Sequence, residues 1–278
     1  MGIERILASS EYDFTLQSVD YIEECIVKFQ HNNLGNFVMG LSGTNGRVRR
    51  ARLQDMLIGM AGRKNIDWKR MRLFLIDERY GSTNEDDSNA HLVRVALIKR
   101  LHKANIAFPE EYLLAPDTSL VPVEACAAEY KDRLVALLDQ EHGPHLVTLG
   151  LAADGSVCSV FPEWYQEVPE RWKAATSKNV NVLCTETSHF EVPRRLCVNL
   201  RLIRKSEQIM VFLGEGTDEA WSNVKQAYDA ERFGQKPPKR ARTLEAEQMM
   251  LSADGFMMVQ ARGARSKPVE PPPASPLD

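Results

Sequence analysis

Short apolar runs alternate along the chain with longer segments whose apolar residues recur at helical spacing. The predicted elements follow in this order: helix 14–32, strand 36–43, helix from Arg47, strand 71–80, helix 88–103, helix 122–140, strand 145–152, apolar runs 180–184, 196–200 and 208–216, and a helix from about Thr217 to Glu231. Ser88 is a good N-cap residue for the predicted helix 88–103. Strands separated by helices predict an α/β fold, a single domain with a parallel-rich sheet and helices on both faces.

Three polar loops follow predicted strand ends, at residues 42–47, 77–89 and 150–159. In open α/β sheets, ligands bind outside the carboxyl ends of the strands, near the point where the strand order reverses. We therefore expect the three loops to converge on one site.

Composition excludes several classes of protein. The chain has 278 residues, of which 44% are hydrophobic and 26% charged, and a formal net charge of -3, so no global field draws it to nucleic acid or to an anionic membrane. The longest apolar runs are about half the length of a bilayer span. The N-terminal sequence contains acidic residues and no long apolar stretch, which argues against a targeting peptide, and we expect a cytoplasmic protein. The five cysteines form no CxxC pair, and we expect buried, reduced thiols and no metal site.

The C-terminal end differs in composition from the rest. Residues 262–278 are rich in proline and lack apolar periodicity, whereas residues 1–261 have the alternation of a folded domain. We interpret 262–278 as a tail that could contact a protein partner in a larger assembly. The basic stretch 236–242 is a weaker candidate contact, since such stretches are usually solvated loops.

The first two loops contain groups that bind anions. The segment 42–47 follows a strand and precedes a helix, so its backbone N–H groups could hold a phosphate, although a simple strand-to-helix turn explains its glycines equally well. The arginines at 47–52 are interpreted as a solvated helix face. Asp77, Glu78 and Arg79 leave a strand end together, and they form either part of a reactive crevice or a buried structural salt bridge.

Together these motifs resemble a known family. In order and spacing, LSGTNGR, LIDERY followed by DDSN, LVTLGLAADGSVCSVFP, Arg195 and VFLGEGTDEA are similar to the 6-phosphogluconolactonases and to their relatives, the glucosamine-6-phosphate deaminases, over roughly residues 10–262. Phe161, Pro162 and Arg195 favour the lactonase branch. The resemblance implies a Rossmann-like α/β fold, opening of a lactone ring by water, no metal or nicotinamide cofactor, and a sugar phosphate as ligand. It implies a phosphate-binding set composed of Ser42, Gly43, Thr44, Arg79, Asn89 and Arg195.

The sequence departs from the family pattern at positions that carry the chemistry. Thr44 and Ala152 replace glycines, Thr217 stands where the family has a phosphate-binding lysine, and Ser156 occupies the position of the catalytic histidine. A serine hydroxyl is too weak a base to take a proton from water at neutral pH, so a contribution of about 10²–10⁴-fold to the rate is missing. Asp154 and Asp77 remain as groups that could position water or substrate.

Two other histidines are candidate replacements for the missing base. His91 is the nearest by sequence logic, whereas His145 begins a strand at the wrong end for the site; a packing or surface role is the preferred interpretation of each. Three functions stay open: a degenerate lactonase-like protein with a binding or structural role in a larger assembly, an active 6-phosphogluconolactonase of the pentose phosphate pathway, and a sugar-phosphate sensor.

Overall fold

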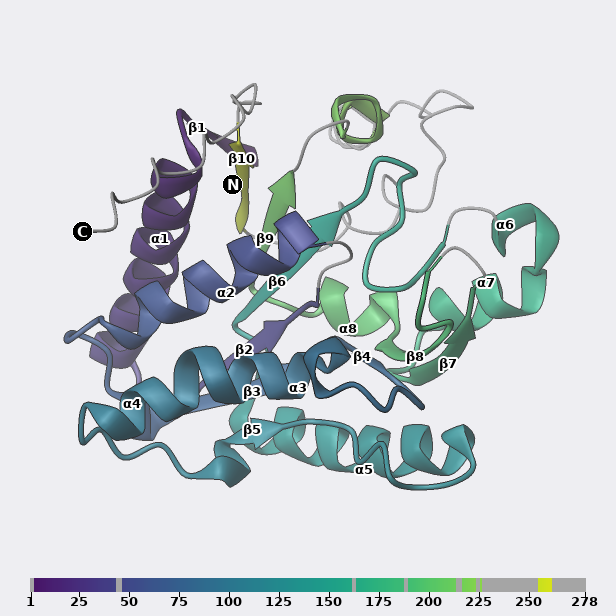
Figure 1. Cartoon of the computed structure of the whole chain (residues 1–278), viewed down its shortest axis with the longest axis horizontal. Coiled ribbons are helices and arrows are strands. Elements are labelled where there is room, and N and C mark those ends of the chain that lie inside the picture. Colours follow the sequence, from purple (N-terminus) through teal and green to yellow (C-terminus); the bar gives the residue numbers. More distant parts are fainter. Residues whose placement is uncertain are drawn as a thin grey trace, which may run out of the picture.

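A seven-stranded parallel sheet forms the centre of the computed structural model (Figure 1). Its strands lie in the order β1 (Ile3–Ala8), β10 (Gly255–Ala261), β9 (Gln208–Leu213), β6 (Leu146–Leu151), β2 (Phe37–Leu41), β3 (Met71–Leu75) and β5 (Leu113–Leu114). Every pairing in it is parallel. The predicted α/β class and parallel-rich sheet are confirmed. Strands β1, β5 and β10 are not among the elements predicted from the sequence.

The structure describes residues 3–43, 47–161, 164–187, 190–213, 217–223, 226 and 255–261. Thr44, Pro162, the stretch 236–242 and the tail 262–278 lie outside the described residues. The division into a domain at 1–261 and a tail at 262–278 therefore stays a prediction, although β10 ends at Ala261.

Helices cover both faces of the sheet because successive strand residues point to opposite sides. On β3, Leu73 and Leu75 join the apolar cluster that contains α1 and α2, whereas Phe74, and Ile76 directly after the strand, join the cluster that contains α5. The helices are α1 (Glu11–Asn32), α2 (Arg47–Ala61), α3 (Asn89–Val93), which continues through the π-helical turn η3 (Arg94–Ile98) into α4 (Lys99–Lys103), α5 (Val123–Glu141), α6 (Trp164–Glu167), α7 (Pro169–Ala175) and α8 (Leu200–Arg204). Residues 218–223 are also helical.

A small antiparallel sheet stands beside the main one, in the order β4 (Asp77–Arg79), β8 (Arg194–Val198) and β7 (Val182–Glu186). Its strands β7 and β8 overlap with the apolar runs 180–184 and 196–200, for which the sequence predicted no particular partner. A parallel connection needs a crossover of about a dozen residues or more, and residues 187–193 are too few. The pairing places Arg79 opposite Arg195.

The state of the cysteines agrees with the prediction. All five cysteines are free thiols, and four of them are buried. Within the described ranges, no helix combines the length and the apolar character that crossing a bilayer requires.

His145 lies just before β6, at the amino end of the sheet. Its Nδ1 accepts a hydrogen bond from the Val38 amide at 2.9 Å, and its ring contacts those of Phe29 and Phe37. Burial lowers the pKa of His145 to about 4. This histidine is a packing residue, as predicted, at the end of β6 opposite the three polar loops.

The low pKa of His145 predicts a loss of stability in weak acid. An unfolded histidine has a pKa of about 6.5, so as the pH falls from about 6.5 to 4 protons bind preferentially to the unfolded chain, which should lower the free energy of unfolding by roughly 3 kcal/mol. His145→Asn keeps an acceptor for Val38 but does not titrate, and its urea-unfolding free energy should fall less over this range. Identical pH profiles for the two proteins would contradict the assignment.

Candidate active site

The three polar loops meet at the carboxyl ends of β2, β3 and β6. The strand order reverses between β2 and β6, because the chain continues from β2 to β3 and β5 on one side and from β6 to β9 on the other. The Ser42 amide donates to the Thr148 carbonyl at 3.2 Å, and the Ile76 amide donates to the Leu41 carbonyl at 2.9 Å. The predicted convergence at a topological switch point is confirmed.

Asp77 connects these loops. Its Oδ1 accepts from the Gly43 amide at 2.7 Å and from the Ser42 hydroxyl at 3.2 Å, and its Oδ2 accepts from the Ser159 hydroxyl at 3.2 Å. The residue is 5% exposed. Since both carboxylate oxygens accept hydrogen bonds from within the protein, Asp77 fixes the loops after β2 and β6 relative to the end of β3.

Asn89 connects Asp77 to Arg79. Its Nδ2 donates to the Asp77 carbonyl at 2.7 Å, and its Oδ1 accepts from Arg79 Nη1. Arg195 lies beside Arg79 in the antiparallel sheet and is 3% exposed, with its guanidinium over the Phe190 ring. Burial lowers the pKa of Arg195, and the charge of Arg79 lowers it further. Two neighbouring guanidinium groups that repel each other favour an anionic ligand.

Glu78 has a structural role that the sequence analysis did not foresee. One carboxylate oxygen accepts from the Arg79 and Asn89 amides, each at 2.8 Å, and the other from the Ala90 amide at 2.8 Å and the Ser88 hydroxyl at 3.0 Å. Burial raises the pKa of Glu78, and the amide donors oppose the rise. Glu78 therefore holds the first turn of α3, which Ser88 also caps through the His91 amide.

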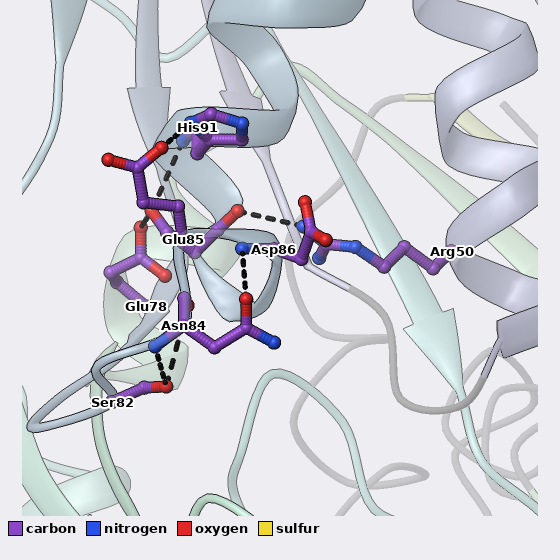
Figure 2. A network of polar contacts seen from close by, with 8 residues as sticks. Arg50, Glu78, Ser82, Asn84, Glu85, Asp86 and His91 are labelled. Atoms are coloured by element: carbon purple, nitrogen blue, oxygen red, sulfur yellow. Dashed lines mark hydrogen bonds and ion pairs between the residues drawn. The ribbon is translucent and has the colours of Figure 1, made fainter.

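A cleft of about 750 Å³ opens next to Arg79. Its described lining consists of Arg50, Gln54, Arg79, Asn84, Asp86, Asp87, His91, Leu92, Val95 and Glu191. Figure 2 shows lining residues of this cleft, among them Arg50, whose guanidinium donates to the Ser88 carbonyl at 2.9 Å, and His91, whose Nδ1 lies 3.4 Å from a carboxylate oxygen of Glu85.

Arg50 corrects one interpretation of the sequence. The arginines at 47–52 were interpreted as a solvated face, but Arg50 is half-buried and borders the cleft. Burial lowers its pKa, and the positive charge of Arg79 lowers it further. Arg50 lies four residues before Gln54 in α2, so both side chains are on the same helix face and both border the cleft. This spacing is visible in the sequence, but it indicates a site only when the packing of α2 beside α3 is known.

The loop after β6 contains Asp154 and Ser156. Asp154 Oδ1 accepts from the Ser156 amide at 2.9 Å and from its hydroxyl at 2.7 Å; Asp154 is exposed, whereas Ser156 is 4% exposed. Gly155 has a φ of 87°, in the left-handed region that favours glycine. Cys158 in the same loop is buried, and burial raises its pKa well above the ordinary value, so it packs and does not present a thiolate.

Among the histidines in the described ranges, His91 alone borders this cleft. His189 and Thr44 lie outside the described residues. Thr217, at the position of the family's lysine, is fully buried just before the helical residues 218–223. Within the part of the chain that the structure describes, no group of three His, Cys, Asp or Glu side chains could hold a metal ion.

Gly43 leaves no room for a side chain, which yields a prediction. A Cβ at this position would lie 2.0 Å from Nδ2 of Asn89, the residue that connects Asp77 and Arg79. Gly43→Ala should displace Asn89 and lower the free energy of unfolding by about 1–3 kcal/mol, measured by urea denaturation. Gly35→Ala is the control, since nothing lies within 4 Å of its Cβ position. Equal effects of the two changes would contradict the close approach.

Comparisons with known proteins identify the family. The family model for glucosamine-6-phosphate isomerases/6-phosphogluconolactonase matches residues 9–250. A probable 6-phosphogluconolactonase 1 of Arabidopsis thaliana is 31% identical over 210 residues, which are 72% of this chain and 71% of the relative. A bifunctional glucose-6-phosphate 1-dehydrogenase/6-phosphogluconolactonase of Plasmodium falciparum is 27% identical over 237 residues, 76% of this chain and 25% of that protein.

The solved structure of a 6-phosphogluconolactonase from Plasmodium vivax shares the fold, with a TM-score of 0.70 at 22% identity, covering 93% of this chain and 91% of that one. The extent of the family match, together with the identity to the plant relative, decides the assignment. The chain belongs to the glucosamine-6-phosphate isomerase/6-phosphogluconolactonase family.

Proposed function

We propose that this protein binds a sugar phosphate in its cleft and hydrolyses the corresponding lactone slowly or not at all, with a binding or structural role in a larger assembly. The observation that carries the proposal is the environment of Ser156. Its hydroxyl donates to Asp154, and a neutral hydroxyl bound in this way cannot accept a proton from water at neutral pH.

The other carboxylate of the site does not supply the missing base. Both oxygens of Asp77 already accept hydrogen bonds from Ser42, Gly43 and Ser159, so they are engaged in holding the loops together. We propose that Asp77 and Asp154 keep positioning roles.

The groups that would recognise a phosphate are better retained. Arg79 and Arg195 lie opposite each other in the antiparallel sheet, and Ser42, Gly43 and Asn89 are linked to Arg79 through the contacts of Asp77 and Asn89. We propose this set, together with Thr44, as the phosphate-binding site. A larger assembly is supported by the relative from Plasmodium falciparum, in which a lactonase is joined to a dehydrogenase.

Two measurements on the purified protein test the proposal. Fresh 6-phosphogluconolactone should disappear at about its spontaneous rate, since the base that contributes about 10²–10⁴-fold is missing. 6-Phosphogluconate at about 100 times its Kd should stabilise the fold by roughly 2.7 kcal/mol in a denaturation assay. Arg79→Gln should remove this stabilisation, whereas Arg52→Gln should retain it, because Arg52 pairs with Glu11 outside the cleft. Rapid turnover would refute the proposal.

A second candidate function is an active lactonase that uses His91 as its base. The observation that favours it is that His91 and Arg79 border the same cleft and that Glu85 pairs with the imidazole. In that case His91→Gln would abolish an activity that wild type shows, whereas the degenerate site predicts no activity to lose.

A further inference from the structure

A second cavity, of about 450 Å³, lies at the other end of the sheet. Gly143 borders it three residues before β6 begins, and Lys205 borders it three residues before β9 begins. The candidate active site follows the carboxyl end of β6. Because the two cavities lie at opposite ends of the same strand, they can bind different ligands independently.

Positive charge dominates the lining of this cavity. Lys178, Arg201 and Lys205 border it, and Asp139 is the one carboxylate among its described lining residues. Within the described ranges, none of the three cations forms an ion pair with a carboxylate. Arg201 and Lys205 are four residues apart, so both project from one side of the α8 segment.

Arg201 also carries an unsatisfied donor. Its Nε is buried and has no hydrogen-bond partner among the described residues. A buried donor of a charged group costs free energy when it is left unpaired. Since Nε itself is shielded from solvent, an anion in the cavity would bind the terminal amino groups of the same guanidinium. The planar guanidinium can bind two oxygens of one phosphate group, while the two lysines supply further charge.

Part of the remaining wall is apolar. Val135 and Leu138 from α5 and Val180 before β7 line the cavity together with the cations. A volume of about 450 Å³ falls in the range of small-molecule sites, which pair an apolar wall with a few polar groups. Inorganic phosphate would leave this wall without a contact.

We infer that this cavity is a second ligand site, distinct from the candidate active site, which takes a phosphomonoester attached to an apolar or aromatic group, as in a nucleoside monophosphate. The phosphate contacts Arg201, Lys178 and Lys205, and the apolar group packs on Val135, Leu138 and Val180. The site does not depend on the proposed function, because it shares no residue with the cleft beside Arg79.

The alternative explanation for the cations is that they only stabilise the ends of helices. α5 and α8 both end near this cavity, and positive side chains stabilise the carboxyl ends of helices whether or not a ligand is present. Arg204 is the matched control for Arg201, because it lies in the same helix, also has a buried Nε without a partner in the described structure, and does not border the cavity.

Isothermal titration of the full chain with AMP tests the inference. AMP should bind at least about tenfold more tightly than adenosine, which lacks the phosphate, and than inorganic phosphate, which lacks the apolar group, since each half contributes about 1.4 kcal/mol or more. Arg201→Gln should weaken AMP binding by about tenfold or more, whereas Arg204→Gln and Arg79→Gln should leave the Kd within about threefold of wild type. Lys205→Gln should also weaken AMP binding. Because Lys205 is exposed, this variant is expected to fold and provides the test if Arg201→Gln does not fold.

Several outcomes would overturn the inference. Equal losses in Arg201→Gln and Arg204→Gln would assign both arginines to helix stability. Loss of AMP binding in Arg79→Gln would place AMP in the candidate active site. If inorganic phosphate bound as tightly as AMP, the apolar wall would not contribute to binding. If AMP did not bind to wild type, the cavity would not be a site for this class of ligand. None of these results would decide whether the protein hydrolyses a lactone, which the assay of the proposed function measures.

Discussion

Replacing Ser156 by histidine is expected to raise the rate of 6-phosphogluconolactone hydrolysis by about 100-fold or more over wild type. An imidazole with a pKa near 6.5 is largely neutral at pH 7 and can accept a proton from the attacking water, which the serine hydroxyl cannot. Asp154 would remain beside it, since Asp154 already accepts from the backbone amide of residue 156. The new activity should rise with pH as the imidazole loses its proton.

Two variants separate basicity from size at this position. Ser156→Ala removes the hydroxyl without adding a base, and Ser156→Asn adds a larger polar side chain that does not titrate; both should hydrolyse the lactone at about the wild-type rate. Arg79→Gln in the Ser156→His background should reduce the gain, because the substrate would lose its phosphate contact. A folded Ser156→His protein that still binds 6-phosphogluconate but shows no gain would mean that more than the base is missing.

The parts of the fold that follow from local periodicity were predictable. Alternating residues such as Leu73 and Phe74 contact opposite helical layers, and this two-sided burial produces the continuous apolar runs from which the parallel strands were predicted. The pairing of β7 and β8 was not predictable from the runs themselves, because apolar runs do not encode which neighbour a strand selects. The shortness of the 187–193 connection was the available signal.

The candidate site shows the same division. Sequence order placed Ser42, Asp77 and Asn89 after strand ends, and the structure links them by hydrogen bonds. The role of Glu78 depends on a helix that begins eleven residues later, and that of Arg50 on the packing of α2 beside α3. Contacts of this kind follow from tertiary structure and leave no local pattern in the sequence.

The largest expected effect on stability is that of Glu78→Ala. The carboxylate is 2% exposed and accepts from three backbone amides and the Ser88 hydroxyl, so alanine would leave several donors without partners at the start of α3. A buried donor without a partner costs about 1–3 kcal/mol, and we expect Glu78→Ala to lower the free energy of unfolding by about 3–5 kcal/mol. Urea denaturation at pH 7 measures this loss.

Glu78→Gln tests the same contacts without creating a cavity. Its single carbonyl oxygen can still accept, but its amide group faces donors, so we expect an intermediate loss of about 1–3 kcal/mol, which is measurable even if the alanine variant does not fold. Glu85→Ala is the matched control, because that carboxylate is 84% exposed and its contact with His91 contributes about 0.5 kcal/mol or less. Because Glu78 accepts from the Asn89 amide, and Asn89 contacts Arg79, the glutamine variant should also weaken binding of 6-phosphogluconate. Unchanged affinity would mean that Glu78 stabilises the start of α3 without affecting the phosphate-binding residues.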